Sequence, residues 1–192
     1  VAECYEELNN TERARFYYAK VTNYCPGLPE AYFGMGSTLE AEDRYYEAIH
    51  QYQKAVEGNS DMVDAWFGLA ECEYLVGNIV SAYEALERAL EIDDSDVETM
   101  RHWATMLADD NRTDKALEML ARGLQAQPKA VELAYLYAAI AFRVGRLNEA
   151  FVILENALMA DFEKHQMLYD YCPEIANIRT IQELIAQYRP HA

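Results

Sequence analysis

Alanine returns along this chain at a fixed interval of 34 residues, at Ala14, Ala48, Ala82, Ala116 and Ala150. A second column, four residues after each alanine, holds only Tyr or Leu: Tyr18, Tyr52, Leu86, Leu120 and Leu154. A third column, twelve residues before each alanine, holds only small residues: Ala2, Gly36, Ala70, Ala104 and Ala138. Small residues at fixed offsets over a period of this length predict stacked helical hairpins. Neighbouring helices approach closely only where no bulky side chain intervenes.

Each copy also carries a predicted break between two helices, five residues before the alanine. The residues at this point are Asn9, Asp43, Gly77, Asn111 and Gly145. Gly, Asn and Asp adopt the left-handed backbone conformation that ends helices more readily than other residues do. We therefore expect every copy to consist of a first helix, a tight turn and a second helix.

This pattern resembles the tetratricopeptide repeat, whose motif places Trp, Leu, Gly, Tyr, Ala, Phe, Ala and Pro at fixed offsets. The copy at residues 63–96 matches that motif through Trp66, Leu69, Ala70, Ala82, Leu86 and Ala89. The resemblance implies an all-α fold, a right-handed solenoid of antiparallel helix pairs. It divides the chain into a partial copy at residues 1–28 and full copies at 29–62, 63–96, 97–130 and 131–164, all in one array. Glu73, Met100 and Ala134 depart from the motif, which loosens packing at single sites.

The pattern begins again after residue 164 and then fails. Leu168, Tyr171 and Cys172 occupy first-helix columns, but Pro173 interrupts the helix that they would start. Between residues 178 and 188 one helix face is apolar, with Ile178, Ile181, Leu184 and Ile185. We expect residues 165–192 to form capping helices that cover the last open surface of the array. The alternative is a docking helix for another chain.

The composition is that of a folded protein with an acidic surface. The chain is 52% hydrophobic and its formal net charge is −17, which disfavours binding to nucleic acid or anionic lipid. No apolar run is long enough to span a membrane. The four cysteines form no metal-binding pattern, and Cys4 and Cys72 share a repeat column that favours a small packing residue, so we expect a reducing, cytoplasmic compartment. The chain opens inside a repeat and looks like an excised fragment, so a targeting sequence lost upstream stays open.

No constellation for catalysis is visible. The histidines His50, His102, His165 and His191 are scattered, and neither a metal-binding motif nor a phosphate-binding glycine loop occurs. The numerous carboxylates fall on predicted solvent faces of helices. We therefore expect no enzymatic activity, no cofactor and no metal.

The resemblance implies a concave groove lined by the second, fifth, ninth and twelfth residues of each copy. The second positions form an acidic row, Glu30, Asp64, Glu98 and Glu132. Acids at a helix start also favour the helix dipole, and aromatics are ordinary at these positions, so both features have a purely structural explanation as well. The candidate peptide-binding residues are Phe33, Asp64, Phe67, Glu71, Tyr74, Glu98, Arg101, Tyr135 and Phe142.

These residues predict a non-enzymatic protein–protein interaction module that serves as scaffold, adaptor or co-chaperone. Its partner would be a peptide or helix with apolar anchors and basic residues. Co-chaperones of this family that grip acidic chaperone tails use basic groove residues, and only Arg101 is basic here. Two alternatives stay open. One is the regulatory or substrate-recruiting part of a larger enzyme, and the other is self-assembly through the N-terminal end near Val1, Tyr5 and Leu8.

Overall fold

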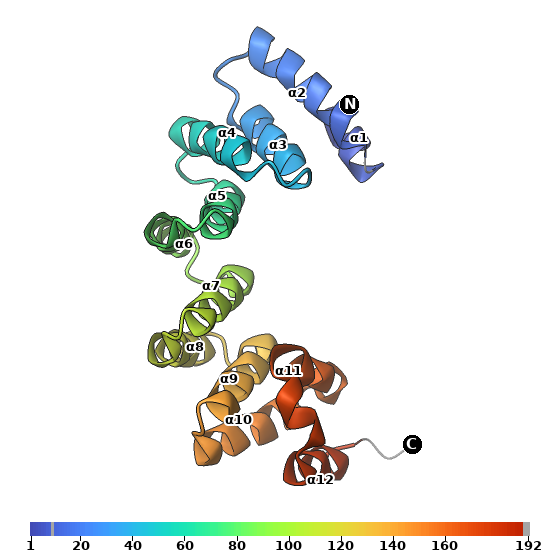
Figure 1. The fold of residues 1–192 in the computed structure, drawn as a ribbon, viewed down its shortest axis with the longest axis vertical. Helices are drawn as coiled ribbons and strands as arrows, with labels where there is room; N and C mark the ends of the chain where they lie inside the picture. The colour runs from blue at the N-terminus through green and yellow to red at the C-terminus, as the bar shows by residue number, and fades with distance from the viewer. Residues whose placement is uncertain (9, 190–192) are drawn as a thin grey trace. The chain divides into compact units, whose positions relative to one another are not determined.

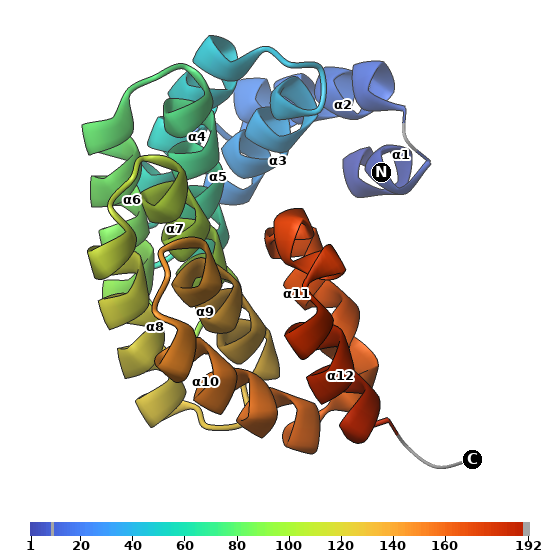
Figure 2. The ribbon, with the colours of Figure 1, turned by 60° about the horizontal axis from the view of Figure 1, so that its bottom comes forward.

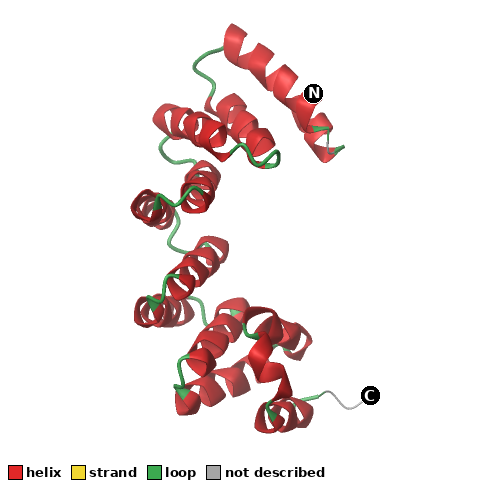
Figure 3. Ribbon diagram, in the orientation of Figure 1, coloured by secondary structure: helices red, strands yellow, loops and turns green. Residues whose placement is uncertain are grey.

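A computed structural model describes residues 1–8 and 10–189 of the chain. These residues form helices joined by short loops, and no strand occurs among them (Figure 3). The prediction of an all-α fold is confirmed. The chain is described below as two compact units, Val1–Asp94 and Ser95–Ala192.

The first unit contains three helix pairs in chain order (Figure 1). Their bounds are α1 Ala2–Glu7 and α2 Thr11–Tyr24, α3 Pro29–Glu40 and α4 Tyr45–Gly58, and α5 Val63–Leu75 and α6 Ile79–Ile92. Each of the first two second helices packs against the first helix of the following pair, α2 on α3 and α4 on α5.

The second unit contains two helix pairs and a C-terminal segment of short helices. The pairs are α7 Val97–Asp109 with α8 Thr113–Ala126, and α9 Val131–Arg143 with α10 Leu147–Ala160. The segment consists of the 3-10 helix η1 Phe162–His165, α11 Gln166–Tyr171, the 3-10 helix η2 Pro173–Asn177, and α12 Arg179–Gln187. Ile181 and Ile185 of α12 are buried, while Ile178 is 43% exposed.

The breaks between paired helices lie where the sequence predicts them. The backbone is left-handed at Asp43, Gly77, Asn111 and Gly145, with φ between 59° and 89°. Asn9, the fifth residue of this series, lies outside the described residues. Nothing lies within 4 Å of a Cβ placed on Gly77 or Gly145, so these glycines are required by backbone conformation and not by crowding.

The alanine column forms the centre of the helix contacts. Ala14, Ala48, Ala82, Ala116 and Ala150 are all 0% exposed. This burial agrees with the close approach of helices that the small residues predict, because any larger side chain in this column would separate the paired helices.

The neighbouring Tyr/Leu column shows how large and small residues are matched between copies. The ring of Tyr52 lies so close to the backbone of α3 and α5 that a Cβ at Gly36 or Gly68 would come within 2.6 Å of it. Tyr18 stands in the same relation to Gly34, with a closest approach of 2.2 Å. A tyrosine in this column therefore requires a glycine in the following first helix.

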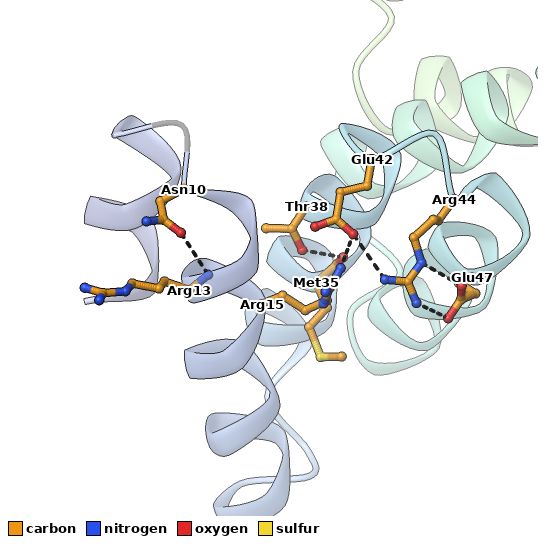
Figure 4. A network of polar contacts seen from close by, with 8 residues as sticks. All are labelled: Asn10, Arg13, Arg15, Met35, Thr38, Glu42, Arg44 and Glu47. Carbon is orange, nitrogen blue, oxygen red and sulfur yellow. Dashed lines mark hydrogen bonds and ion pairs between the residues drawn. The ribbon is translucent and has the colours of Figure 1, made fainter.

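A polar network ties α2 to the turn between α3 and α4 (Figure 4). Glu42 accepts hydrogen bonds from Arg15 of α2 and from Arg44 Nη1, the latter at 3.1 Å. Arg44 also forms a two-pronged contact with Glu47, with distances of 2.7 and 2.6 Å. These contacts are partly exposed, so they fix the geometry of the turn more than they stabilise the fold.

Candidate partner-binding surfaces

In the first unit the candidate residues come from two first helices. Phe33 belongs to α3, while Asp64, Phe67, Glu71 and Tyr74 belong to α5. We call this set the α3–α5 face. The two helices contact each other directly, and Phe33, Phe67, Glu71 and Tyr74 are each partly exposed. The face thus presents aromatic surface beside carboxylates.

The acidic edge of this face has a structural explanation and a functional one. Asp64 is exposed in the first turn of α5, and Glu30 is exposed in the first turn of α3. Both carboxylates favour the positive end of their helix dipole. Both carboxylates are also exposed to solvent, as steering of a charged ligand would require.

Beneath the α3–α5 face lies a polar cluster that the sequence analysis did not identify. Tyr52 is 1% exposed and its hydroxyl donates a hydrogen bond of 2.5 Å to Oε2 of Glu40, a twelfth-position residue. Burial raises the pKa of Glu40, and the hydrogen bonds from Tyr52 and Cys72 only partly offset this effect. Burial also raises the pKa of Tyr52 and of Cys72. Glu40 is therefore a structural partner of Tyr52 and not a surface acid for a ligand.

A signal for this pairing exists in the sequence. Tyr18 donates a 2.6 Å hydrogen bond to Glu6, one repeat before the pair formed by Tyr52 and Glu40. In both copies the glutamate precedes the tyrosine by twelve residues. In the next copy Leu86 takes the place of the tyrosine, and the residue twelve positions before it is not an acid. A buried tyrosine hydroxyl requires an acceptor, which explains why the two positions change together.

In the second unit two of the candidate residues are not on a free surface. Tyr135 is 0% exposed and its hydroxyl donates to the backbone carbonyl of Asp161 at 2.8 Å. Phe142 is 8% exposed and packs edge-on against Phe151, with ring centroids 5.1 Å apart. The expectation that Tyr135 and Phe142 line an open groove is corrected here, because both side chains are in the core.

Both residues belong to α9, which packs against α10 and also against α11. Helix α11 lies beside α9 (Figures 1 and 2), and its Leu168 is 0% exposed. Every residue of α9 from Leu133 to Phe142 is buried. The C-terminal segment therefore covers the face of α9 that corresponds to the partly exposed face of α3 and α5.

Glu98 and Arg101 are the remaining candidates in this unit. Glu98 is exposed and accepts a hydrogen bond of 3.2 Å from Nε of Arg101. Arg101 also interacts through its side chain with Tyr171, at the end of α11. The pKa of Glu98 is lowered by Arg101, so this carboxylate stays charged. Arg101 is thus engaged within the unit and does not stand open to an external carboxylate.

The described part of the chain shows neither a metal-binding cluster nor a membrane-spanning helix. Within it, no group of three or more His, Cys, Asp or Glu side chains is placed to hold a metal ion. None of the helices that the structure describes combines the length and the apolar character needed to cross a membrane. A hollow of about 280 Å³ between α8, α9 and α10 is lined mainly by apolar residues such as Leu124, Val131 and Ile153.

Comparisons with known proteins agree with this architecture. Two family models, both described as tetratricopeptide repeat, match the chain. The first matches residues 33–97 and 103–162, and the second matches residues 1–27. The DnaJ homolog subfamily C member 7 of Mus musculus is 24% identical over 187 residues, which cover 88% of this chain and 38% of that protein. The chain thus spans well under half the length of this relative.

Two solved structures share the fold. The crystal structure of MamA aligns with a TM-score of 0.75 at 18% identity, over 86% of this chain and 97% of that one. YrrB, described as a TPR protein with an unusual peptide-binding site, aligns with a TM-score of 0.68 at 22% identity, over 88% of this chain and 87% of that one.

Proposed function

Because this chain belongs to the tetratricopeptide repeat family, we propose that it is a protein–protein interaction module that binds a peptide or helix of a partner on the α3–α5 face. The observation that carries the proposal is the difference between the two units. The fifth-position aromatics Phe33 and Phe67 are partly exposed, whereas Tyr135 at the equivalent position of the second unit is fully buried. Partly exposed aromatics supply much of the binding energy at protein interfaces.

The partner's chemistry follows from the charges on this face. Asp64, Glu71 and the neighbouring Glu30 are acidic, and the chain as a whole has a net charge of −17. A ligand with apolar anchors flanked by Lys or Arg complements such a surface, while an acidic peptide is repelled. A carboxylate-gripping co-chaperone site is therefore not the function that we propose. Within the class of scaffolds and adaptors, a module of this kind needs no catalytic activity of its own.

The proposal is tested with matched variants of one unit. The partner is first captured with the full-length protein and identified by mass spectrometry, and its binding segment is then titrated by calorimetry. Phe67→Ala should weaken binding by about 2 kcal/mol, or roughly 30-fold, whereas Val80→Ala on α6, which is 71% exposed, should not. Asp64→Lys should slow association with a basic partner, and the same charge change at Glu84 serves as the control.

The contrary outcome is equally specific. If Phe67→Ala and Asp64→Lys bind normally while Glu84→Lys abolishes binding, the second helices form the working surface. In that case the assignment of the α3–α5 face is wrong.

Self-association is a second candidate function, favoured by exposed apolar residues in the N-terminal part of the first unit. Val1 is 75% exposed, Leu8 73%, Phe16 55% and Tyr24 86%. Docking of this surface on a second copy would remove it from water. Sedimentation of the wild-type chain and of Leu8→Ser/Phe16→Ser tests this function, because only a dimer held by these residues dissociates in the variant.

The proposal includes a cytoplasmic location, and it leaves a role within a larger enzyme as the alternative. The four cysteines are free thiols, of which Cys4 and Cys25 are exposed, and this is in keeping with a reducing, cytoplasmic environment. The alternative role as the recruiting part of a larger enzyme uses the same binding surface. It is distinguished by assaying the full-length protein for turnover that depends on the partner segment.

A further inference from the structure

The inner face of α9, defined by the groove positions Glu132, Tyr135, Ala139 and Phe142, is covered by the C-terminal segment at the place where the family resemblance puts a ligand. The C-terminal cover, defined here as residues 162–188, contacts the residues that the repeat register places in a groove. Tyr171 interacts with Arg101, a fifth-position residue, and Lys164 forms an ion pair with Glu132, a second-position residue. Between these two polar contacts, Leu168 is completely buried.

The cover has little helical stability of its own. Its α11 has only six residues and is followed by Pro173, and α12 has only nine. Isolated helices shorter than about 12 residues are marginal in water, so side-chain contacts hold these elements in place. A segment that depends on a few contacts opens more readily than the helices beneath it.

The surface beneath the cover is suited to this kind of ligand. Tyr135, Ala139 and Phe142, which the repeat register places on the groove side of α9, are all buried, and the charged groups Glu132 and Arg143 lie at the two ends of the helix. An apolar helix face with charges at its margins is the arrangement that binds an amphipathic helix. The sequence of the cover then shows which helix fits, namely one with Leu and Tyr three residues apart and Lys four residues before the Leu.

We propose that the inner face of α9 is a second binding surface, specific for an amphipathic helix of this Lys-x3-Leu-x2-Tyr pattern, and that the C-terminal cover is its displaceable internal occupant. The proposal goes beyond the function assigned to the α3–α5 face and does not depend on it. A tethered occupant has an effective concentration in the millimolar range, so an external helix binds only when the cover is weakened or out-competed.

Cys172 provides a direct test in the intact wild-type chain. This cysteine is 2% exposed at the end of α11, and Cys72 in the first unit is 0% exposed. Alkylation by iodoacetamide, resolved by peptide mass spectrometry, should modify Cys172 while the amides of α9 and α10 remain protected from hydrogen exchange. Labelling of Cys172 only at the rate at which α9 and α10 lose protection would show a permanent cap and would overturn the proposal.

Two full-chain variants weaken the cover to different degrees. Leu168→Ala should raise the labelling rate of Cys172 roughly 30-fold, and Tyr171→Phe, which keeps the ring but loses the contact with Arg101, roughly 5-fold. Met159→Ala is the matched control, because this α10 residue is 63% exposed and the labelling rate should not change. If Leu168→Ala unfolds the unit, the Tyr171→Phe measurement decides alone.

The binding step is tested with the cover as a peptide. A fluorescein-labelled peptide of residues 162–188 should bind to the weakened chain more tightly than to wild type, and the same peptide with Leu168→Asp should bind to neither. A folded variant with rapid Cys172 labelling that fails to bind the peptide would refute a ligand-binding role for α9. These readouts involve only the second unit, so their failure leaves the proposal for the α3–α5 face untouched.

Discussion

The packing of Tyr52 between two glycines leads to a prediction about the sign of a mutational effect. Gly68 lies within α5, where replacement by alanine favours the helix by about 1 kcal/mol in the absence of other contacts. At this site the added Cβ would lie 2.6 Å from Cζ of Tyr52 and 2.9 Å from its Cε2 and its hydroxyl oxygen. Contacts this short do not occur in relaxed proteins, so something must shift.

The ring has no direction in which to move. Its opposite side lies against Gly36, where a Cβ would also meet ring atoms at 2.6 to 3.0 Å, and its hydroxyl is held by Glu40. Overpacking of a core typically costs about 1 to 3 kcal/mol, and a clamped ring places Gly68→Ala in the upper part of that range. After subtraction of the gain in helix propensity, we expect a net destabilisation of about 1 to 2 kcal/mol.

A second substitution should reverse the effect. The Tyr/Leu column holds Leu at Leu86, Leu120 and Leu154, all 0% exposed, so leucine is compatible with this position of the repeat. In the Tyr52→Leu background the clash is absent, and Gly68→Ala should then be neutral or stabilising by up to about 1 kcal/mol. Gly27→Ala is the control, because nothing lies within 4 Å of a Cβ placed on this residue and the change should stay within about 0.5 kcal/mol.

Hydrogen exchange measured by mass spectrometry is the suitable assay, because it reports on each compact unit separately. Amides of α3 to α5 should lose protection in Gly68→Ala, while those of α7 to α10 serve as an internal reference. A variant that is more stable than wild type, or an unchanged effect in the Tyr52→Leu background, would refute the argument that the ring is clamped.

Three further predictions concern single residues. Because burial raises the pKa of Glu40, the folded state favours its protonated form. The contribution of this group to the free energy of unfolding is therefore full below its ordinary pKa of 4.5 and declines as the pH rises through the pKa of the folded state. Chemical unfolding should find Glu40→Gln more stable than wild type at pH 7, with the difference vanishing toward pH 4. Tyr135→Ala removes a fully buried ring and should lower the free energy of unfolding by about 3 to 5 kcal/mol in the same experiment. An unchanged free energy of unfolding would instead show that this side chain lines an open groove. Gly77→Ala should destabilise by about 1 to 2 kcal/mol through its φ of 89° alone, and calorimetry would contradict this if the variant melts at or above the wild-type temperature.

The sequence by itself determined the helix pairs and the contacts between them. The left-handed turns at Asp43, Gly77, Asn111 and Gly145 and the buried alanine column follow from residue type and period alone. The physical reason is that a repeat array places each copy in the same environment, so a residue that recurs every 34 positions reports on a recurring contact. For the same reason the register placed Phe33 and Phe67 at the same position of two successive first helices, and the family resemblance implied that this position lines the groove.

Only the tertiary structure decided which of the predicted binding residues are exposed. Tyr135 and Phe142 occupy groove columns in the register, but α9 packs against both α10 and α11, and the two side chains are buried. The position of the C-terminal cover depends on contacts such as those of Leu168 and Lys164, which no period encodes. The pairing of Tyr52 with Glu40 was likewise settled by burial, because a tyrosine hydroxyl needs a specific acceptor only once the fold has removed it from water.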